Sequence, residues 1–520
     1  DLTNINNVHL VLDNMLSYNM EKNQHSVSAI LGTAAESNDY KISAARGTGY
    51  DSDLIQTLSG ATTIALAQST EFENNLLSFF GRVNYAYDNK YLISLSYRRD
   101  GSSVFGTDNK YGDFPSVAVG WNVGNENFLR DNDLISRFKV RFSYGVTGNN
   151  ALDAGNVLID NYPYLNLLGS STAVVDGSIV SGFNSLNISN PELKWERSIE
   201  LNPGIDFGFF NNRITGSFDY YKRTSDQLLL FNPISSTTGF TNALVNIGEV
   251  ENRGVELEVR TRNVRTKNFT WTSKAIATRN ENELIDFAES DGQIQSVDSK
   301  RAAEWINLEG NPISSFYGWV ADDEIPAEFI KDPYHPVGAQ SQDIYVKDLN
   351  GDGLIDDDDK TILGDPYPDF IWSLTNEFRI SNFDFSFMFQ GSHGAEVRNI
   401  ADQYLYNQFN SAQDFTPETP NQGFIKQKIF TSDQIMDASY VSLRNVNIGF
   451  NIPERVLSST KFLSRARIYV AAQNLIYITA DDYTGFNPES INDTSPTTYG
   501  YQRAGSPIFR SYTAGVNIEF

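Results

Sequence analysis

The sequence contains no cysteine and only four histidines. Among its 520 residues, His9, His25, His335 and His393 are scattered, and none forms an HExxH pair. Without thiols, disulfides and cysteine-ligated metal sites are excluded. Without paired histidines, a catalytic zinc site is not expected.

Long hydrophobic runs are also missing. No stretch approaches the roughly 18 apolar residues of a membrane helix, and the mean hydropathy is −0.36. Any membrane contact must therefore be made by β-strands. No Gly-x-Ser-x-Gly elbow, P-loop or dinucleotide fingerprint is present, so no enzyme is predicted. The net charge of −25 argues against a nucleic-acid partner.

Aromatic residues are abundant, and many segments alternate strictly between apolar and polar residues. The chain has 26 Tyr and 34 Phe. Its last segment, RSYTAGVNIEF, places five apolar side chains on one face of a strand and small or polar ones on the other. Such a strand ending on an aromatic is typical of the closing strand of an outer-membrane barrel, and the alternative is the last strand of a soluble β-sandwich.

About fifteen segments show this alternation, and their connections alternate in length. Phe383, Phe385, Phe387 and Phe389, for example, share one face. Short links are expected at 88–89, 209–212, 262–267 and 381–382, with a modest one at 453–464, and long links at 99–114, 224–252, 280–369, 392–437 and 479–507. The alternation of short and long links favours an all-β fold, a large antiparallel transmembrane β-barrel with short periplasmic turns and long extracellular loops.

An open sheet edge has no hydrogen-bond partners in lipid, and bacterial barrels usually have even strand numbers. About fifteen strands therefore imply that others are supplied upstream or by another chain. We expect residues 1–520 to be the C-terminal part of an outer-membrane β-barrel, with the plug domain and first strands not present.

Several ordered motifs resemble one family, the SusC-like, TonB-dependent outer-membrane transporters of the Bacteroidetes. They are YRRDGSSVFG (97–106), FPSVAVGWNV (114–123), FKVRFSYGVTGN (138–149), NPELKWERS (190–198), VENRGVELEV (250–259), DLNGDGLIDDDDKTILGDPYPDF (348–370), ASYVSLRNVNIGFNIP (438–453) and AAQNLIYIT (471–479).

The resemblance implies a barrel of about 22 strands with a plugged lumen, in the outer membrane of a Gram-negative bacterium. It implies import of oligomeric nutrients, glycan or peptide, beneath a SusD-like surface lipoprotein. Energy would come from TonB, acting through an N-terminal region missing from these residues. The outer-membrane lipid would contact the strands. The alternative of another class is a structural or assembly scaffold within a larger outer-membrane complex.

One stretch of the 280–369 loop has the spacing of an EF-hand-like calcium loop, at 348–359. Gly353 would supply its sharp turn, and the oxygen ligands would come from Asp348, Asn350, Asp352, Leu354 (backbone carbonyl), Asp356 (through water) and Asp359. Asp replaces the usual Glu at the last position, and no helical pattern flanks the loop. We predict a structural calcium ion, and the alternative is a solvated acidic loop.

Aromatic residues in the long loops are candidates for stacking on sugar rings or peptide side chains. With equal chemical reason they fold the loops onto one another. They are Tyr317, Trp319, Tyr404, Tyr406, Tyr483 and Phe486.

Overall fold

The computed structural model describes residues 1–520 except 53, 55–56, 131, 153–155, 288–291, 296–303, 322–346, 353–356, 400–429, 459–461, 492–494, 496 and 504. Within these ranges, no helix is long and apolar enough to cross a membrane.

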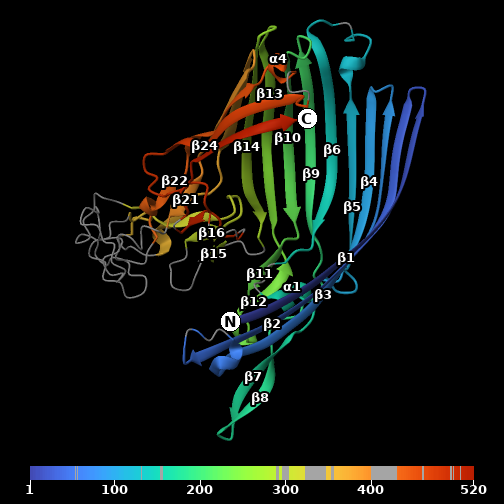
Figure 1. Cartoon of the computed structure of the whole chain (residues 1–520). Coiled ribbons are helices and arrows are strands. Elements are labelled where there is room, and N and C mark those ends of the chain that lie inside the picture. The colour runs from blue at the N-terminus through green and yellow to red at the C-terminus, as the bar shows by residue number, and fades with distance from the viewer. Residues whose placement is uncertain are drawn as a thin grey trace, which may run out of the picture. The chain divides into compact units, whose positions relative to one another are not determined.

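One sheet of fifteen strands dominates the fold, and its strands follow one another in chain order (Figure 1). They are β1 Leu2–Lys22, β2 His25–Tyr50, β3 Ala61–Tyr87, β4 Tyr91–Ser102, β5 Tyr111–Trp121, β6 Ile135–Asn149, β9 Glu196–Phe209, β10 Ile214–Asp226, β13 Glu249–Arg265, β14 Phe269–Asp286, β19 Phe370–Ile380, β20 Phe383–His393, β23 Tyr440–Asn451, β24 Arg465–Thr479 and β26 Ser511–Glu519. The all-β, antiparallel prediction of about fifteen strands is confirmed.

Smaller elements occupy the long connections. They are the hairpins β7 Leu168–Val175 with β8 Ser178–Ser185 and β11 Leu229–Pro233 with β12 Asn242–Asn246, the four-stranded sheet β15 Gln293–Gln295, β16 Trp305–Asn307, β17 Ser315–Trp319 and β18 Lys360–Gly364, the three-stranded sheet β22 Ile435–Asp437, β21 Glu396–Asn399 and β25 Tyr501–Gln502, and the helices α1 Val157–Asn161 and α4 Glu454–Leu457. Short 3-10 turns lie at Leu58–Gly60, Val123–Asn125, Ser236–Thr238, Asp357–Asp359 and Ser432–Gln434.

The chain divides into two compact units. Unit 1 comprises Asp1–Asn122, Arg141–Leu201 and Arg223–Glu249. Unit 2 comprises Val123–Val140, Asn202–Lys222 and Val250–Phe520.

The register of unit 2 confirms the alternation of the last strand. Val516 of β26 pairs with Ile468 of β24, and Ile468 pairs with Phe450 of β23. Directly paired residues share a face of a sheet, so the apolar stripe continues across three strands. Phe520, at the end of this stripe, is 84% exposed.

The phenylalanine stripe of β20 continues the same apolar face. Phe385 pairs with Phe378 of β19 and with Ile448 of β23. On the opposite face, Asp384 accepts a hydrogen bond from Arg467 Nε at 3.0 Å. The sheet in unit 2 therefore has one apolar and one ionic face, as a wall between lipid and water requires.

Tight turns close the short connections. Asp88 and Asn89, between β3 and β4, have φ of 53° and 50°. Positive φ at two successive residues is the type I′ geometry that suits the twist of a hairpin, and Asn and Asp tolerate it best among side-chain-bearing residues. Ser381, between β19 and β20, has φ of 54°.

The long connections begin later than predicted. Strand β14 continues to Asp286, so the expected 280–369 loop starts seven residues late, and β4 and β5 shorten the 99–114 link to 103–110. The sequence did not predict these extra strand residues because they are polar. A strand that extends beyond the lipid-facing region does not need alternating apolar side chains.

Candidate functional site

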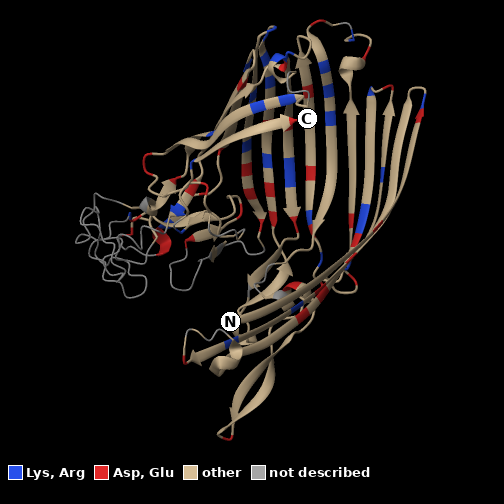
Figure 2. Ribbon diagram, in the orientation of Figure 1, with Lys and Arg blue, Asp and Glu red and all other residues tan. Residues whose placement is uncertain are grey.

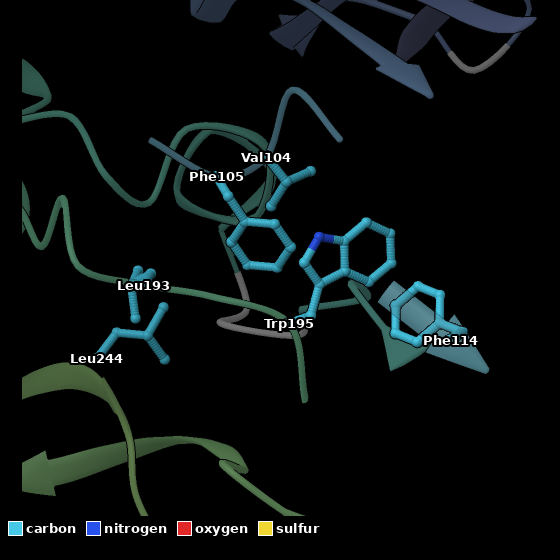
Figure 3. Packing of buried hydrophobic residues seen from close by; sticks show 6 residues of the cluster. All are labelled: Val104, Phe105, Phe114, Leu193, Trp195 and Leu244. Atoms are coloured by element: carbon cyan, nitrogen blue, oxygen red, sulfur yellow. The ribbon is translucent and has the colours of Figure 1, made fainter. Parts of the chain in front are cut away.

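Residues of the long connections in unit 1 and Phe114 of β5 meet in a hydrophobic cluster, which we call the tryptophan cluster (Figure 3). Its members come from the β4–β5, β6–β9 and β10–β13 segments and are Val104, Phe105, Phe114, Leu193, Trp195 and Leu244. The Trp195 ring lies 5.5 Å from that of Phe105 and 5.4 Å from that of Phe114, and its Nε1 donates to the Lys110 carbonyl at 2.9 Å. Phe105 and Leu193 are fully buried.

Polar contacts fix the same connections to each other. Asn190 Nδ2 donates to the Leu244 carbonyl at 3.0 Å, and Asn246 Nδ2 donates to the Lys194 carbonyl at 2.7 Å. Any Cβ added at Gly106 would lie 2.8 Å from the Pro191 carbonyl oxygen. The NPELKWERS segment thus serves packing between connections, a role that its sequence alone did not reveal.

The three long connections of unit 2 fold together into what we call the loop module, the described residues of 287–369, 394–439 and 480–510. Trp305, Phe316 and Phe430 are fully buried in it, beside Tyr501. Trp305 Nε1 donates to the Tyr499 carbonyl at 2.9 Å. One aromatic core therefore draws on all three connections.

A buried ion pair lies in the same core. Arg398 is 1% exposed and Glu304 is 2% exposed, and Arg398 NH2 lies 3.3 Å from Glu304 Oε1. The guanidinium also lies 5.0 Å from the centre of the Phe430 ring. Within the described part of the chain, Glu304 Oε2 and Arg398 Nε have no hydrogen-bond partner. Desolvation of this pair is therefore only partly compensated.

Two acidic residues, Asp365 and Glu396, join neighbouring connections of the loop module. The Asp365 amide donates to Glu396 Oε2 at 3.0 Å, and the Glu396 amide donates to the Asp365 carbonyl at 3.2 Å. Burial, reinforced by the nearby charges of Asp365 and Asp437, raises the pKa of Glu396 to about 6. Burial also raises the pKa of Asp365. Sequence reasoning did not single out either residue, because their partners are remote in the chain.

A bulge attaches the loop module to the sheet. The register of β23 shifts between Leu443 and Asn445, which places Arg444 outside the regular alternation. Its guanidinium pairs with Glu489 of the β24–β26 connection, and the Tyr440 hydroxyl donates to the same carboxylate at 2.6 Å. Bulges commonly re-aim a side chain in this way.

The predicted calcium ligands are only partly described. Asp348 Oδ1 accepts from the Gly351 amide at 2.7 Å, and Asn350 Oδ1 accepts from the Asp352 amide at 2.9 Å. The fully buried Asp359 accepts from the Leu349 amide at 2.8 Å, so the loop's last position folds back onto its start. Leu354 and Asp356 lie outside the described residues. Among the residues described, no three His, Cys, Asp or Glu side chains converge as a metal site.

The aromatic candidates separate into two groups. Trp319 is 2% exposed, with Lys360 Nζ 4.2 Å from its ring centre, and Tyr483 is 7% exposed, with its hydroxyl donating to Gln502 at 2.9 Å. Both therefore fold the loops. Tyr317 is half-buried, whereas Phe486 is 62% exposed. Tyr404 and Tyr406 lie outside the described residues.

Comparison with known proteins identifies the fold. The family described as "TonB dependent receptor-like, beta-barrel" matches residues 3–475. TonB-dependent receptor P3 of Formosa agariphila is 34% identical over 99% of this chain and 52% of that protein. TonB-dependent receptor SusC of Bacteroides thetaiotaomicron is 30% identical over 86% of this chain and 44% of that protein.

Solved structures agree. The RagAB peptide importer in its "closed-closed" state superposes with a TM-score of 0.81 at 23% identity, covering 100% of this chain and 56% of that one. The chain spans about half the length of the curated relatives it matches. It belongs to the TonB-dependent receptor-like β-barrel family and is SusC-like, and proteins of this kind are outer-membrane β-barrels of Gram-negative bacteria.

Proposed function

We propose that this chain forms the wall of a TonB-dependent importer of oligomeric nutrients, either glycans or peptides. The observation that carries the proposal is the sheet with one apolar and one ionic face, whose long connections, where the structure describes them, pack into the loop module. The membership of the receptor family and the likeness to a peptide importer support it. Transport requires no catalytic residue.

The proposed import has two partners. A SusD-like surface lipoprotein would cover the long connections on the extracellular side, and TonB would act through a region outside residues 1–520. The described part of the loop module is packed around a buried core, and a prefolded surface loses less conformational entropy on binding a lid than a flexible one.

Uptake of labelled oligosaccharides and oligopeptides by the native host tests this function. Deleting the gene for the full-length protein should abolish uptake of one oligomer class, and deleting the TonB gene should do the same. Co-purification of a surface lipoprotein would support the lid. Unchanged uptake of every oligomer, together with loss of another outer-membrane assembly, would favour the scaffold alternative.

We further propose a structural calcium ion at 348–359. Its support is the calcium-loop spacing of the oxygen-bearing side chains Asp348, Asn350, Asp352 and Asp359, together with the hydrogen bond from the Leu349 amide that brings Asp359 back to the start of the loop. Leu354 and Asp356 would complete the set. The ion would screen the local repulsion, since 321–369 holds fourteen acidic and three basic residues.

Limited proteolysis of the full-length protein tests the ion. With calcium, the connection should resist cleavage, and chelator or the double variant Asp348→Ala, Asp352→Ala should make it sensitive while the barrel stays folded. Asp357→Asn is the matched control, because Asp357 pairs with Lys360 at 2.6 Å and lies outside the donor set. Equal cleavage with calcium and with chelator would contradict the proposal.

A further inference from the structure

A polar cavity of about 620 Å³ lies in unit 2, where β13, β14, β19 and β20 approach their short turns. Besides two carboxylates and the paired Phe378 and Phe385, three arginines and three hydroxyl residues line it, namely Arg262, Arg265, Arg379, Thr270, Thr272 and Ser386. Figure 2 shows basic residues at the end of β13 and β14 that the short turn joins. The function proposed above gives this cavity no role.

The register places the β14, β19 and β20 side chains Thr270, Arg379 and Asp384 of this cavity on the ionic face of the sheet. Thr270 pairs with Arg379, and Arg379 pairs with Asp384. Phe378 and Phe385, which pair with each other, alternate with these residues and belong to the apolar face. In a barrel the polar face lines the lumen, so the cavity lies along the route of any transported molecule.

The cavity has more positive than negative charge. Asp384, one of its two carboxylates, is already bonded to Arg467 and accepts from Asn451 Nδ2 at 2.8 Å. Nearby Lys274 pairs with Glu258 at 3.0 Å. In the described part of the chain, Arg262, Arg265 and Arg379 form no ion pair, which leaves three cations against Glu377.

Two arginines near the long-connection ends of their strands differ from the cavity arginines, because each forms an ion pair. Arg223 pairs with Glu200 at 2.6 Å, and Arg197 pairs with Asp226 at 2.6 Å. Their charge is already neutralised by the protein. In a chain of net charge −25, three guanidinium groups that form no ion pair with another described residue outnumber the two carboxylates of the cavity, which favours a positive local potential.

We propose that this cavity receives an oxyanion group, a sulfate ester or a carboxylate, on the oligomer that the protein imports. The planar fork of a guanidinium matches both groups, and hydroxyls add donors around them. Rings of basic side chains select anions in other pores. The inference rests on the proposed import function and narrows its cargo to acidic oligomers.

The reaction rate of a single engineered cysteine with charged reagents reports the electrostatic potential of the cavity and its accessibility to solvent in the full-length protein. Because residues 1–520 contain no cysteine, Ser386→Cys gives a defined target once any thiol elsewhere in the protein has been replaced. Its reaction rates with anionic sulfonatoethyl and cationic trimethylammonioethyl methanethiosulfonate are compared. The anionic reagent should be favoured, and Arg262→Gln with Arg379→Gln should lower the rate ratio at least about threefold.

Two control variants check this reading. Arg262→Lys with Arg379→Lys retains the charge and should retain the ratio. Arg223→Gln, which removes a cation already paired, should leave it unchanged. No reaction of either reagent in the folded protein would overturn the inference, because another segment would then fill the cavity. An unchanged ratio in the double glutamine variant would overturn it as well.

Binding of defined oligomers distinguishes the sources of the oxyanion. Calorimetry compares oligogalacturonate with its methyl ester, a sulfated carrageenan oligosaccharide with a neutral agarose oligosaccharide, and an Ala-Glu repeat peptide with an Ala-Gln repeat. At least one anionic probe should lose about tenfold or more in affinity in the double glutamine variant, and its neutral counterpart should not change.

Failure of this inference and failure of import are distinguishable. If oligomers are taken up with no preference for charge, the cavity has no such role and the import function stands. If no oligomer is taken up in any arm, the import function fails whatever the cavity binds. Failure of every anionic probe to bind also counts against the inference.

Discussion

The tryptophan cluster of unit 1 and the loop module of unit 2 both hold long connections together, but they do so with different side-chain chemistry. Each joins three long connections that are remote in sequence. The tryptophan cluster does so with apolar side chains framed by Asn190 and Asn246. The loop module adds two small sheets, a buried ion pair and partly buried carboxyl groups.

The difference predicts how each region responds to change. An apolar cluster loses stability in proportion to the contacts removed and is indifferent to pH. Buried charges make stability depend on partners and protonation. The loop module should therefore be the adjustable region and the tryptophan cluster the fixed one.

The largest effect is expected for Trp195→Ala. Removing a buried indole costs about 3–5 kcal/mol, which should expose the unit 1 connections to hydrogen exchange. Trp195→Phe keeps the ring contacts and loses the hydrogen bond to Lys110, at a cost of about 1 kcal/mol. Equal exchange in both variants would mean that the ring packing is not what joins these connections.

Next comes Arg398→Met. Leaving Glu304 buried without its cation should destabilise the loop module by about 3 kcal/mol. Faster hydrogen exchange of the Trp305 and Tyr501 backbone amides would measure this loss. Adding Glu304→Met should restore most of that loss, because the original pair leaves Glu304 Oε2 and Arg398 Nε without partners. A double variant as unstable as the single one would show that the pair is net stabilising.

The smallest effect is expected for Glu396→Gln. The folded-state pKa of Glu396 is about 6, above the ordinary value of 4.5. Ionisation therefore opposes folding: the stability present below pH 4.5 is lost as pH rises through about 6. The variant should stabilise the loop module at pH 7 by about 1 kcal/mol or less and have little effect at pH 4.5. Protease resistance against pH measures this. The tryptophan cluster should show no such dependence.

The sequence predicted the sheet well, because alternation is a direct consequence of strand geometry. The stripe Phe383–Phe389 and the turn at Asp88 and Asn89 needed no tertiary information. Strand ends were missed where the chain leaves the apolar zone, as at β14, whose continuation to Asp286 is polar.

The candidate site was less predictable. Trp195, Arg398 and Glu396 act through partners 85, 94 and 31 residues away, and no local pattern marks such pairs. Trp319 and Tyr483 were candidate ligand contacts, but burial makes them part of the loop packing. The cavity arginines were visible as residues, yet only the folded sheet shows that they line one cavity.

The hydrogen bond from Trp305 to the Tyr499 carbonyl joins residues 194 positions apart. This contact can form only after the segment between the two residues, which contains eight of the described strands (β17 to β24), has been brought into place. Closing so long a loop is slow and comes late. Burial of the Trp305 indole should therefore come late in folding. We expect the change in Trp305 fluorescence to accompany the last step of membrane insertion rather than the first.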